Sequence, residues 1–92
     1  MDEQLLHGHN GALLCVALSN GHVASGSDDG SIIIHSISSN KVEYRADKFF
    51  VNAVEGLCYL PNGSGLVACG YDGLGGNDLM VFSPSLELVQ TL

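Results

Sequence analysis

The side chains of this 92-residue chain that could bind a metal or react are four histidines, ten acidic residues and three cysteines. His7 and His9 stand two positions apart, close enough for both imidazoles to hold one zinc ion. No second pair of ligands follows at the spacing of a zinc site. We therefore expect no metal, with His9 buried against Asp29 and His7 facing solvent.

Two acidic or glycine-rich segments also invite a ligand-binding interpretation. The run from Gly73 to Gly76 has the composition of a phosphate loop, but it lacks the Gly-Lys-Ser/Thr end and no helix is expected after it. Asp28-Asp29-Gly30 lacks the alternating oxygen ligands and final glutamate of a calcium loop. No serine or cysteine lies in a nucleophile-elbow sequence. We predict a non-enzyme without cofactor or metal.

The three cysteines, Cys15, Cys58 and Cys69, form an odd set without a Cys-x-x-Cys pair, and each lies in an apolar segment. Cysteines placed in this way usually behave as small buried hydrophobic residues. Structural disulfides are characteristic of oxidising compartments. A set of free thiols therefore favours the cytoplasm or the nucleus.

The charge balance limits the partners. The net charge is −7, and the basic residues are Lys41, Arg45 and Lys48. Binding to nucleic acid or to anionic membranes requires clustered Lys and Arg. No stretch approaches the roughly 20 apolar residues of a membrane helix. We expect neither nucleic acid nor membrane as a partner, but a polar or mildly basic protein surface.

The elements that would position these side chains are short strands, and the clearest two meet at Asp28-Asp29-Gly30. Residues 22–27 precede this turn, and residues 31–37 follow it with three consecutive isoleucines. Asp-Gly between apolar strands predicts a hairpin with a type I′ turn, in which both central residues have positive φ. The isoleucine run does not alternate with polar residues, so we expect that strand to be covered on both faces.

Strands of this kind recur in the same order along the chain. The turn Asn20-Gly21 matches Asn62-Gly63 at an offset of 42 residues, and Ala24 matches Ala68 at an offset of 44, which places two extra residues in the second turn. A period of about 40–45 residues with four strands is typical of a β-propeller blade. We predict an all-β chain of two four-stranded antiparallel blades, residues 1–45 and 46–92.

The first unit resembles the WD40 repeat. Gly8-His9, and further along Ser25-Gly26-Ser27-Asp28-Asp29-Gly30-Ser31-Ile32-Ile33-Ile34, are similar to the WD40 pattern of a Gly-His dipeptide, a strand and a hairpin that ends in Trp-Asp. In that family the histidine, a strand hydroxyl, the turn aspartate and the tryptophan are often joined by hydrogen bonds. The resemblance gives these structural roles to His9, Ser25 or Ser27, Asp29, Gly30 of the turn, and His35. Because His35-Ser36 replaces Trp-Asp, we expect a less rigid blade than the consensus.

The second unit departs further from the WD40 pattern. It lacks Gly-His, its turn is lengthened between Tyr71 and Asn77, and Phe82 stands where the tryptophan would be. A regular first blade, then Phe50-Val51-Asn52-Ala53-Val54, then an enlarged glycine-rich turn is similar to the first two blades of the phospholipase A2-activating protein family. That resemblance implies an adaptor in ubiquitin-dependent protein degradation whose propeller binds ubiquitin.

One face of such a propeller is where partners commonly dock, because the loops that enter the inner strands and the turns between second and third strands meet there. Adjacent Phe49 and Phe50 would give an apolar anchor within a polar rim, unless one of them packs between the blades. An acidic rim suits the basic ring around the apolar patch of ubiquitin. The expected partner-binding residues are Asn10, Gly11, Asp28, Phe49, Phe50, Asn52, Asp72 and Asn77.

Two blades leave an apolar blade face exposed at either end, whereas closed propellers usually have four to eight blades. We expect these faces to be covered by the remaining blades of a longer chain or by self-association, since three or four copies would supply six or eight blades. The leading function is non-catalytic protein recognition, with ubiquitin as the partner. The alternative is a structural or assembly blade pair, or a self-associating scaffold, in another complex.

Overall fold

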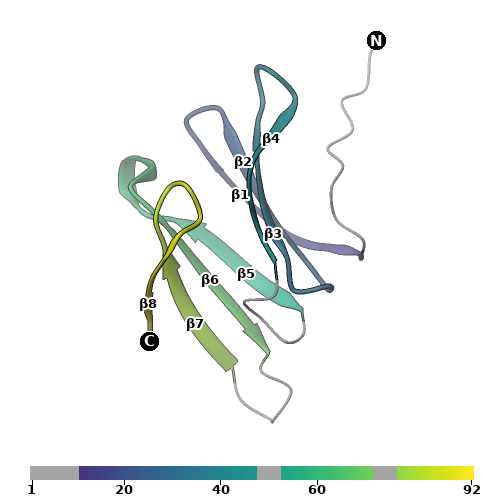
Figure 1. Cartoon of the computed structure of the whole chain (residues 1–92), viewed down its shortest axis with the longest axis vertical. Helices are drawn as coiled ribbons and strands as arrows, with labels where there is room; N and C mark the ends of the chain where they lie inside the picture. Colours follow the sequence, from purple (N-terminus) through teal and green to yellow (C-terminus); the bar gives the residue numbers. More distant parts are fainter. Residues whose placement is uncertain (1–10, 48–52, 72–76) are drawn as a thin grey trace.

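The computed structural model describes residues 11–47, 53–71 and 77–92 of the chain. Within these residues the strands form two antiparallel four-stranded sheets in chain order, β1-β2-β3-β4 (blade 1) and β5-β6-β7-β8 (blade 2), as Figure 1 shows. The strands are β1 Leu13–Ser19, β2 His22–Ser27, β3 Ile32–Ser36, β4 Lys41–Ala46, β5 Val54–Tyr59, β6 Leu66–Tyr71, β7 Asn77–Phe82 and β8 Leu88–Thr91. The prediction of an all-β chain with two four-stranded antiparallel sheets is confirmed.

The turn between β2 and β3 differs from the predicted type I′ turn. The backbone N–H of Ser27 donates to Ser31 O at 3.2 Å, and within residues 28–30 positive φ is confined to Gly30, at 84°. A three-residue hairpin loop ends in a left-handed residue of this kind, which glycine adopts without steric cost. The two-residue turn with both residues at positive φ occurs instead between β1 and β2, at Asn20 (48°) and Gly21 (81°).

The two blades can be aligned through their ladders because each has the same irregularity. The pairing shifts between Leu13 and Cys15 in blade 1, and between Val54 and Gly56 in blade 2. When the bulges are aligned, Val16 is equivalent to Leu57, so the observed offset is 41 residues where 42 were predicted. Ser25 is equivalent to Ala68, an offset of 43 residues where 44 were predicted. The two extra residues of the second turn are as predicted, and they lie in the β5–β6 connection, which contains the 3₁₀ turn Pro61–Gly63.

The third strands align in the same way. Val23 pairs with His35 in blade 1, and Leu66 pairs with Phe82 in blade 2, so His35 and Phe82 hold equivalent positions. The isoleucine run of β3 is buried on both faces, as predicted, since Ile32, Ile33 and Ile34 are all at most 1% exposed.

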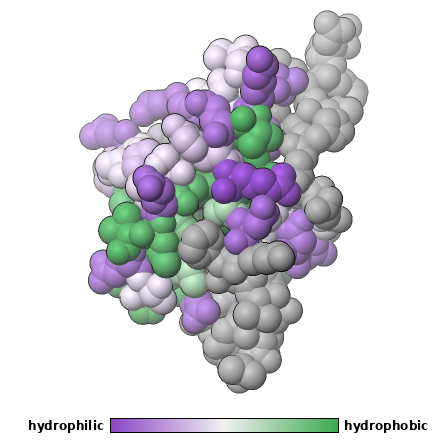
Figure 2. Space-filling model, viewed as in Figure 1, coloured by the Kyte–Doolittle hydropathy of each residue, from purple (hydrophilic) through white to green (hydrophobic). Residues whose placement is uncertain are grey.

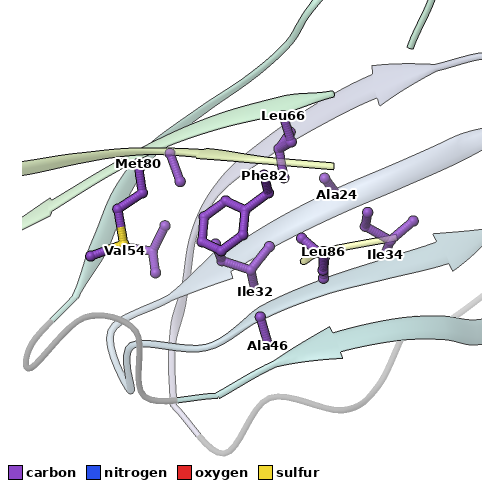
Figure 3. Close-up of a cluster of buried hydrophobic side chains, with 10 residues drawn as sticks. Ala24, Ile32, Ile34, Ala46, Val54, Leu66, Met80, Phe82 and Leu86 are labelled. Atoms are coloured by element: carbon purple, nitrogen blue, oxygen red, sulfur yellow. The ribbon is translucent and has the colours of Figure 1, made fainter. Parts of the chain in front are cut away.

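The hydrophobic core lies between the two blades. Phe82 is 1% exposed, and its ring points toward Ile32 of the facing sheet (Figure 3). Gly26 permits the close approach, because a Cβ atom there would lie 2.6 Å from Cγ1 of Val54. The buried cluster consists of Ala24, Ile32, Ile34 and Ala46 from blade 1, with Val54, Leu66, Ala68, Met80, Phe82 and Leu86 from the second half of the chain. Contacts between the sheets therefore supply most of the apolar burial that stabilises the fold.

Phe82→Ala should lower the free energy of unfolding by about 3–5 kcal/mol, since it removes a buried aromatic ring and leaves a cavity between the blades. The matched control is Val89→Ala on β8, where the side chain is 64% exposed. That variant should change the free energy of unfolding by about 0.5 kcal/mol or less. Urea unfolding followed by circular dichroism measures both, and equal midpoints for the two variants would contradict a core centred on Phe82.

Candidate functional site

Blade 1 exposes apolar side chains on its first strand, β1. Leu14, Val16 and Leu18 of β1, which we call the β1 stripe, are 49%, 55% and 69% exposed. Cys15 and Ala17 pack against the core instead. Because successive side chains of a strand point to opposite faces, the stripe faces away from blade 2.

The face that carries the β1 stripe is not open everywhere. Val16 pairs with Ser25, and Ser25 pairs with Ile33, so these three residues share one side of the sheet. Ser25 and Ile33 are buried, at 4% and 0% exposure, and so is His35, at 2%. The face is therefore closed over β3 and open over β1.

Blade 2 has a second open face, on the side away from blade 1. Cys58 is exposed, Leu79 is 37% exposed, and the others are half-buried. The members of this open face of blade 2 are Cys58, Val67, Cys69, Leu79 and Val81. Figure 2 shows that hydrophobic side chains also gather at the surface on the left of that view, beside hydrophilic ones.

The two open faces are the equivalents of the two faces that already pack together inside the chain. By the ladder alignment, Val16 and Leu18 correspond to Leu57 and Tyr59, which pack against the core. Val67, Leu79 and Val81 correspond in the same way to Ala24, Ile32 and Ile34, which are buried. In each blade, therefore, one face packs against the other blade of the chain and the opposite face does not.

The cysteines differ in their environments. The prediction that all three are buried is wrong for Cys58, whose position in β5 turns it toward the open face of blade 2. Cys15 and Cys69 are half-buried. Cys15 lies against the second blade, with Sγ 3.5 Å from Val54 O, and burial raises the pKa of its thiol.

The two aspartates of the β2–β3 turn have separate structural tasks. Asp28 Oδ1 accepts a hydrogen bond from the backbone N–H of Ala12 at 2.8 Å, which ties the turn to the start of the first blade. Asp29 Oδ1 accepts from the backbone N–H of Ser31 at 2.9 Å and from its Oγ at 2.5 Å. These bonds hold the hairpin closed.

Of the predicted partner-binding residues, the structure brings Gly11 and Asp28 together. A Cβ atom on Gly11 would collide with the Asp28 carboxylate, so the Asp28 side chain lies against the Gly11 backbone. Asn77 begins β7, paired with Tyr71. The remaining predicted positions lie outside the described residues: Asn10, Phe49, Phe50, Asn52 and Asp72.

The predicted structural set is partly described. Ser25, Ser27 and His35 are buried, as their roles would require. Ser25 Oγ donates to Ile33 O at 3.4 Å, and Ser27 Oγ accepts from the backbone N–H of Asp29 at 3.2 Å. His9 lies outside the described residues, so the bonds expected of it stay a prediction.

A groove between the blades was not anticipated from the sequence. It has a volume of about 420 Å³, and its lining includes His22, Ile34, Tyr44, Tyr59 and Asn62. These residues come from four strands and a turn, and no motif links them along the chain. The position of one blade against the other creates the groove, so only the folded arrangement could reveal it.

Metal and membrane signals are absent from the described residues. In residues 11–47, 53–71 and 77–92, no three His, Cys, Asp or Glu side chains are grouped so that they could hold a metal ion. Among the same residues no helix is long and apolar enough to cross a membrane.

Comparisons with known proteins agree with this architecture. Residues 2–36 match the family model described as "WD domain, G-beta repeat". The matched segment includes β1, β2 and β3. No curated protein matches the chain. The crystal structure of the computationally designed Ika4 protein is similar, with 22% sequence identity and a TM-score of 0.78 over 96% of this chain and 52% of that one. The chain thus spans about half the length of that protein, and the likeness shows the fold: two four-stranded blades of the propeller type.

Asp29→Ala should lower the free energy of unfolding by about 1–3 kcal/mol, because it removes the acceptor of two hydrogen bonds donated by buried Ser31. Asp29→Asn is the control, since its amide oxygen can accept the same two bonds and should recover most of the loss. Thermal unfolding of the three proteins measures this, and equal losses in both variants would contradict an acceptor role for the Asp29 side chain.

Proposed function

We propose that this chain is a non-catalytic protein-interaction module that joins further propeller-type blades through its two open blade faces. The β1 stripe carries the proposal. A contiguous apolar surface on a soluble protein commonly marks an interaction site. Burying one Leu or Val side chain is worth about 1.5–3 kcal/mol, so three of them on one strand give a partner a substantial gain.

The partner that fits the stripe best is a face like the open face of blade 2. The equivalent pair of faces already packs within the chain, where Leu57 and Tyr59 of β5 meet the sheet that contains Ala24 and Ile34. A second copy of the chain carries such a face. Because this contact is head-to-tail, it generates a ring when the rotation between copies closes. Three or four copies would complete six or eight blades.

Light scattering of the purified chain tests this association. The wild-type mass should be that of an assembly of three or four chains, each of 9.6 kDa. Leu18→Lys, at a position 69% exposed in the single chain, should give a folded monomer because it would bury a charge in the contact.

The matched control is Val89→Lys, because Val89 is 64% exposed and belongs to neither open face. It should leave the wild-type mass unchanged. A folded wild-type monomer at high protein concentration, or equal dissociation by the two lysine variants, would contradict the proposed contact.

The finer proposal names ubiquitin as a partner. It is supported by the sequence resemblance described above and by the net charge of −7, which suits a surface ringed by basic residues. Its residues of interest, Phe50 and Asp72, lie outside the described structure.

Retention on immobilised ubiquitin tests the finer proposal. Phe50→Ala and Asp72→Lys should each weaken retention by about tenfold, since one removes the apolar anchor and the other reverses a rim charge. Val89→Ala should retain wild-type binding. Equal retention of all four proteins would contradict a ubiquitin site on this face and favour the alternative, an assembly blade pair in another complex.

A further inference from the structure

The groove between the blades has the size of a binding site. Its volume of about 420 Å³ falls in the range of ligand pockets in general. One wall comes from blade 1, with His22 and Tyr44, and the other from blade 2, with Tyr59, Asn62 and Ser85. It lies beside the β1–β2 and β5–β6 turns, on the core side of both blades, and so it is separate from the β1 stripe.

The lining of the groove is partly aromatic and apolar, since it includes Ile34, Tyr44 and Tyr59. Ile34 is 1% exposed, and Tyr44 is 39% exposed. The Oη atom of Tyr59 is buried and has no hydrogen-bond partner in the described part of the chain. Because that oxygen is buried, the groove offers a ligand the ring of Tyr59 rather than its hydroxyl group.

The charge at the groove is negative. Glu43 Oε1 lies 2.8 Å from His22 Nε2, at the wall formed by blade 1. Burial raises the pKa of the Tyr59 phenol, and the charge of Glu43 raises it further. On the other wall, Ser85 Oγ donates to Glu87 Oε1 at 3.1 Å.

The lining contains no Lys or Arg, and its basic side chain is His22, which contacts Glu43. Lys41, which is exposed, begins β4 and pairs with Ser36, as His22 also does, so it lies on the same side of the sheet. The chain as a whole carries a net charge of −7. The field in the groove therefore favours a cation.

We propose that this groove binds an arginine side chain of a partner protein. A guanidinium group is planar and stacks on tyrosine rings such as those of Tyr44 and Tyr59. Its N–H donors form a rigid fork, so a guanidinium group that lies against these rings can also pair with the partly exposed Glu43 carboxylate beside His22. Lysine has a compact ammonium group that stacks less well, so it should bind more weakly.

A titration of the isotopically labelled chain, followed by NMR chemical shifts, tests the site. The ligand is an acetylated peptide amide with one arginine between glycines, and the matched peptide contains citrulline, which has the same shape without the charge. The arginine peptide should shift the backbone amides of Tyr44, Tyr59 and Asn62 saturably. Because citrulline lacks the charge that pairs with Glu43, the citrulline peptide should bind about tenfold more weakly or worse.

Three variants separate a site from general attraction. Glu43→Gln should weaken arginine binding by about tenfold, whereas Tyr59→Phe, which keeps the ring and removes only a buried hydroxyl group, should leave the affinity within about twofold. Glu55→Gln is the matched control: it makes the same change of charge at an exposed residue of β5, whereas Glu43 contacts His22 of the lining, and it should leave the affinity within about twofold. Circular dichroism confirms that each variant is folded.

The outcomes are decisive in both directions. Equal binding of the citrulline peptide overturns the preference for a cation, and equal losses in Glu43→Gln and Glu55→Gln overturn a specific site. Shifts that do not saturate at millimolar peptide overturn binding altogether. Leu18→Lys, which blocks the association through the β1 stripe, should keep the wild-type affinity for arginine, so the failure of one proposal can be told from the failure of the other.

Discussion

The close contact between the two blades is the interaction on which the rest of the structure depends. Strands β1 and β5 lie side by side, and the absence of a side chain at Gly26 lets Val54 and Cys15 fill the space between the sheets. That approach brings Phe82 against Ile32 and buries the cluster that stabilises both sheets. An isolated four-stranded sheet would leave this apolar face in water, so neither blade has a satisfied core without a neighbour.

The same contact decides what remains exposed. Each strand alternates its side chains between two faces, and an inner strand of a propeller blade is apolar on both. Packing blade 2 on one face of β1 therefore leaves the β1 stripe on the other. The groove has the same origin, since it is the space between two sheets that meet closely at Gly26. Core, stripe and groove are three consequences of one packing arrangement.

The sequence predicted the parts of the structure that depend on local patterns. The isoleucine run indicated a strand covered on both faces, and the repeated turns indicated two equivalent units, because burial and turn formation leave their mark on neighbouring residues. The turn at Asp28-Asp29-Gly30 was predicted with the wrong geometry, since an Asp-Gly pair is compatible with a two-residue or a three-residue loop. The backbone bond from Ser27 to Ser31 decides between them. The exposure of Cys58 and the groove were not predictable from patterns, because both depend on which face of one blade meets the other.

The face that carries the β1 stripe is less apolar than its equivalent in blade 2, and this sets an order of strengths. Where the internal contact has Phe82 and Ala68, the face with the β1 stripe has His35 and Ser25 at the equivalent positions, and these are already buried. A neighbouring blade therefore gains the burial of the stripe on β1, but not that of an aromatic ring on β3. Association at this face should then be weaker than the contact that holds the two blades together. The pair of blades acts as the cooperative unit, and a partner adds to it at an edge that can open without unfolding the core.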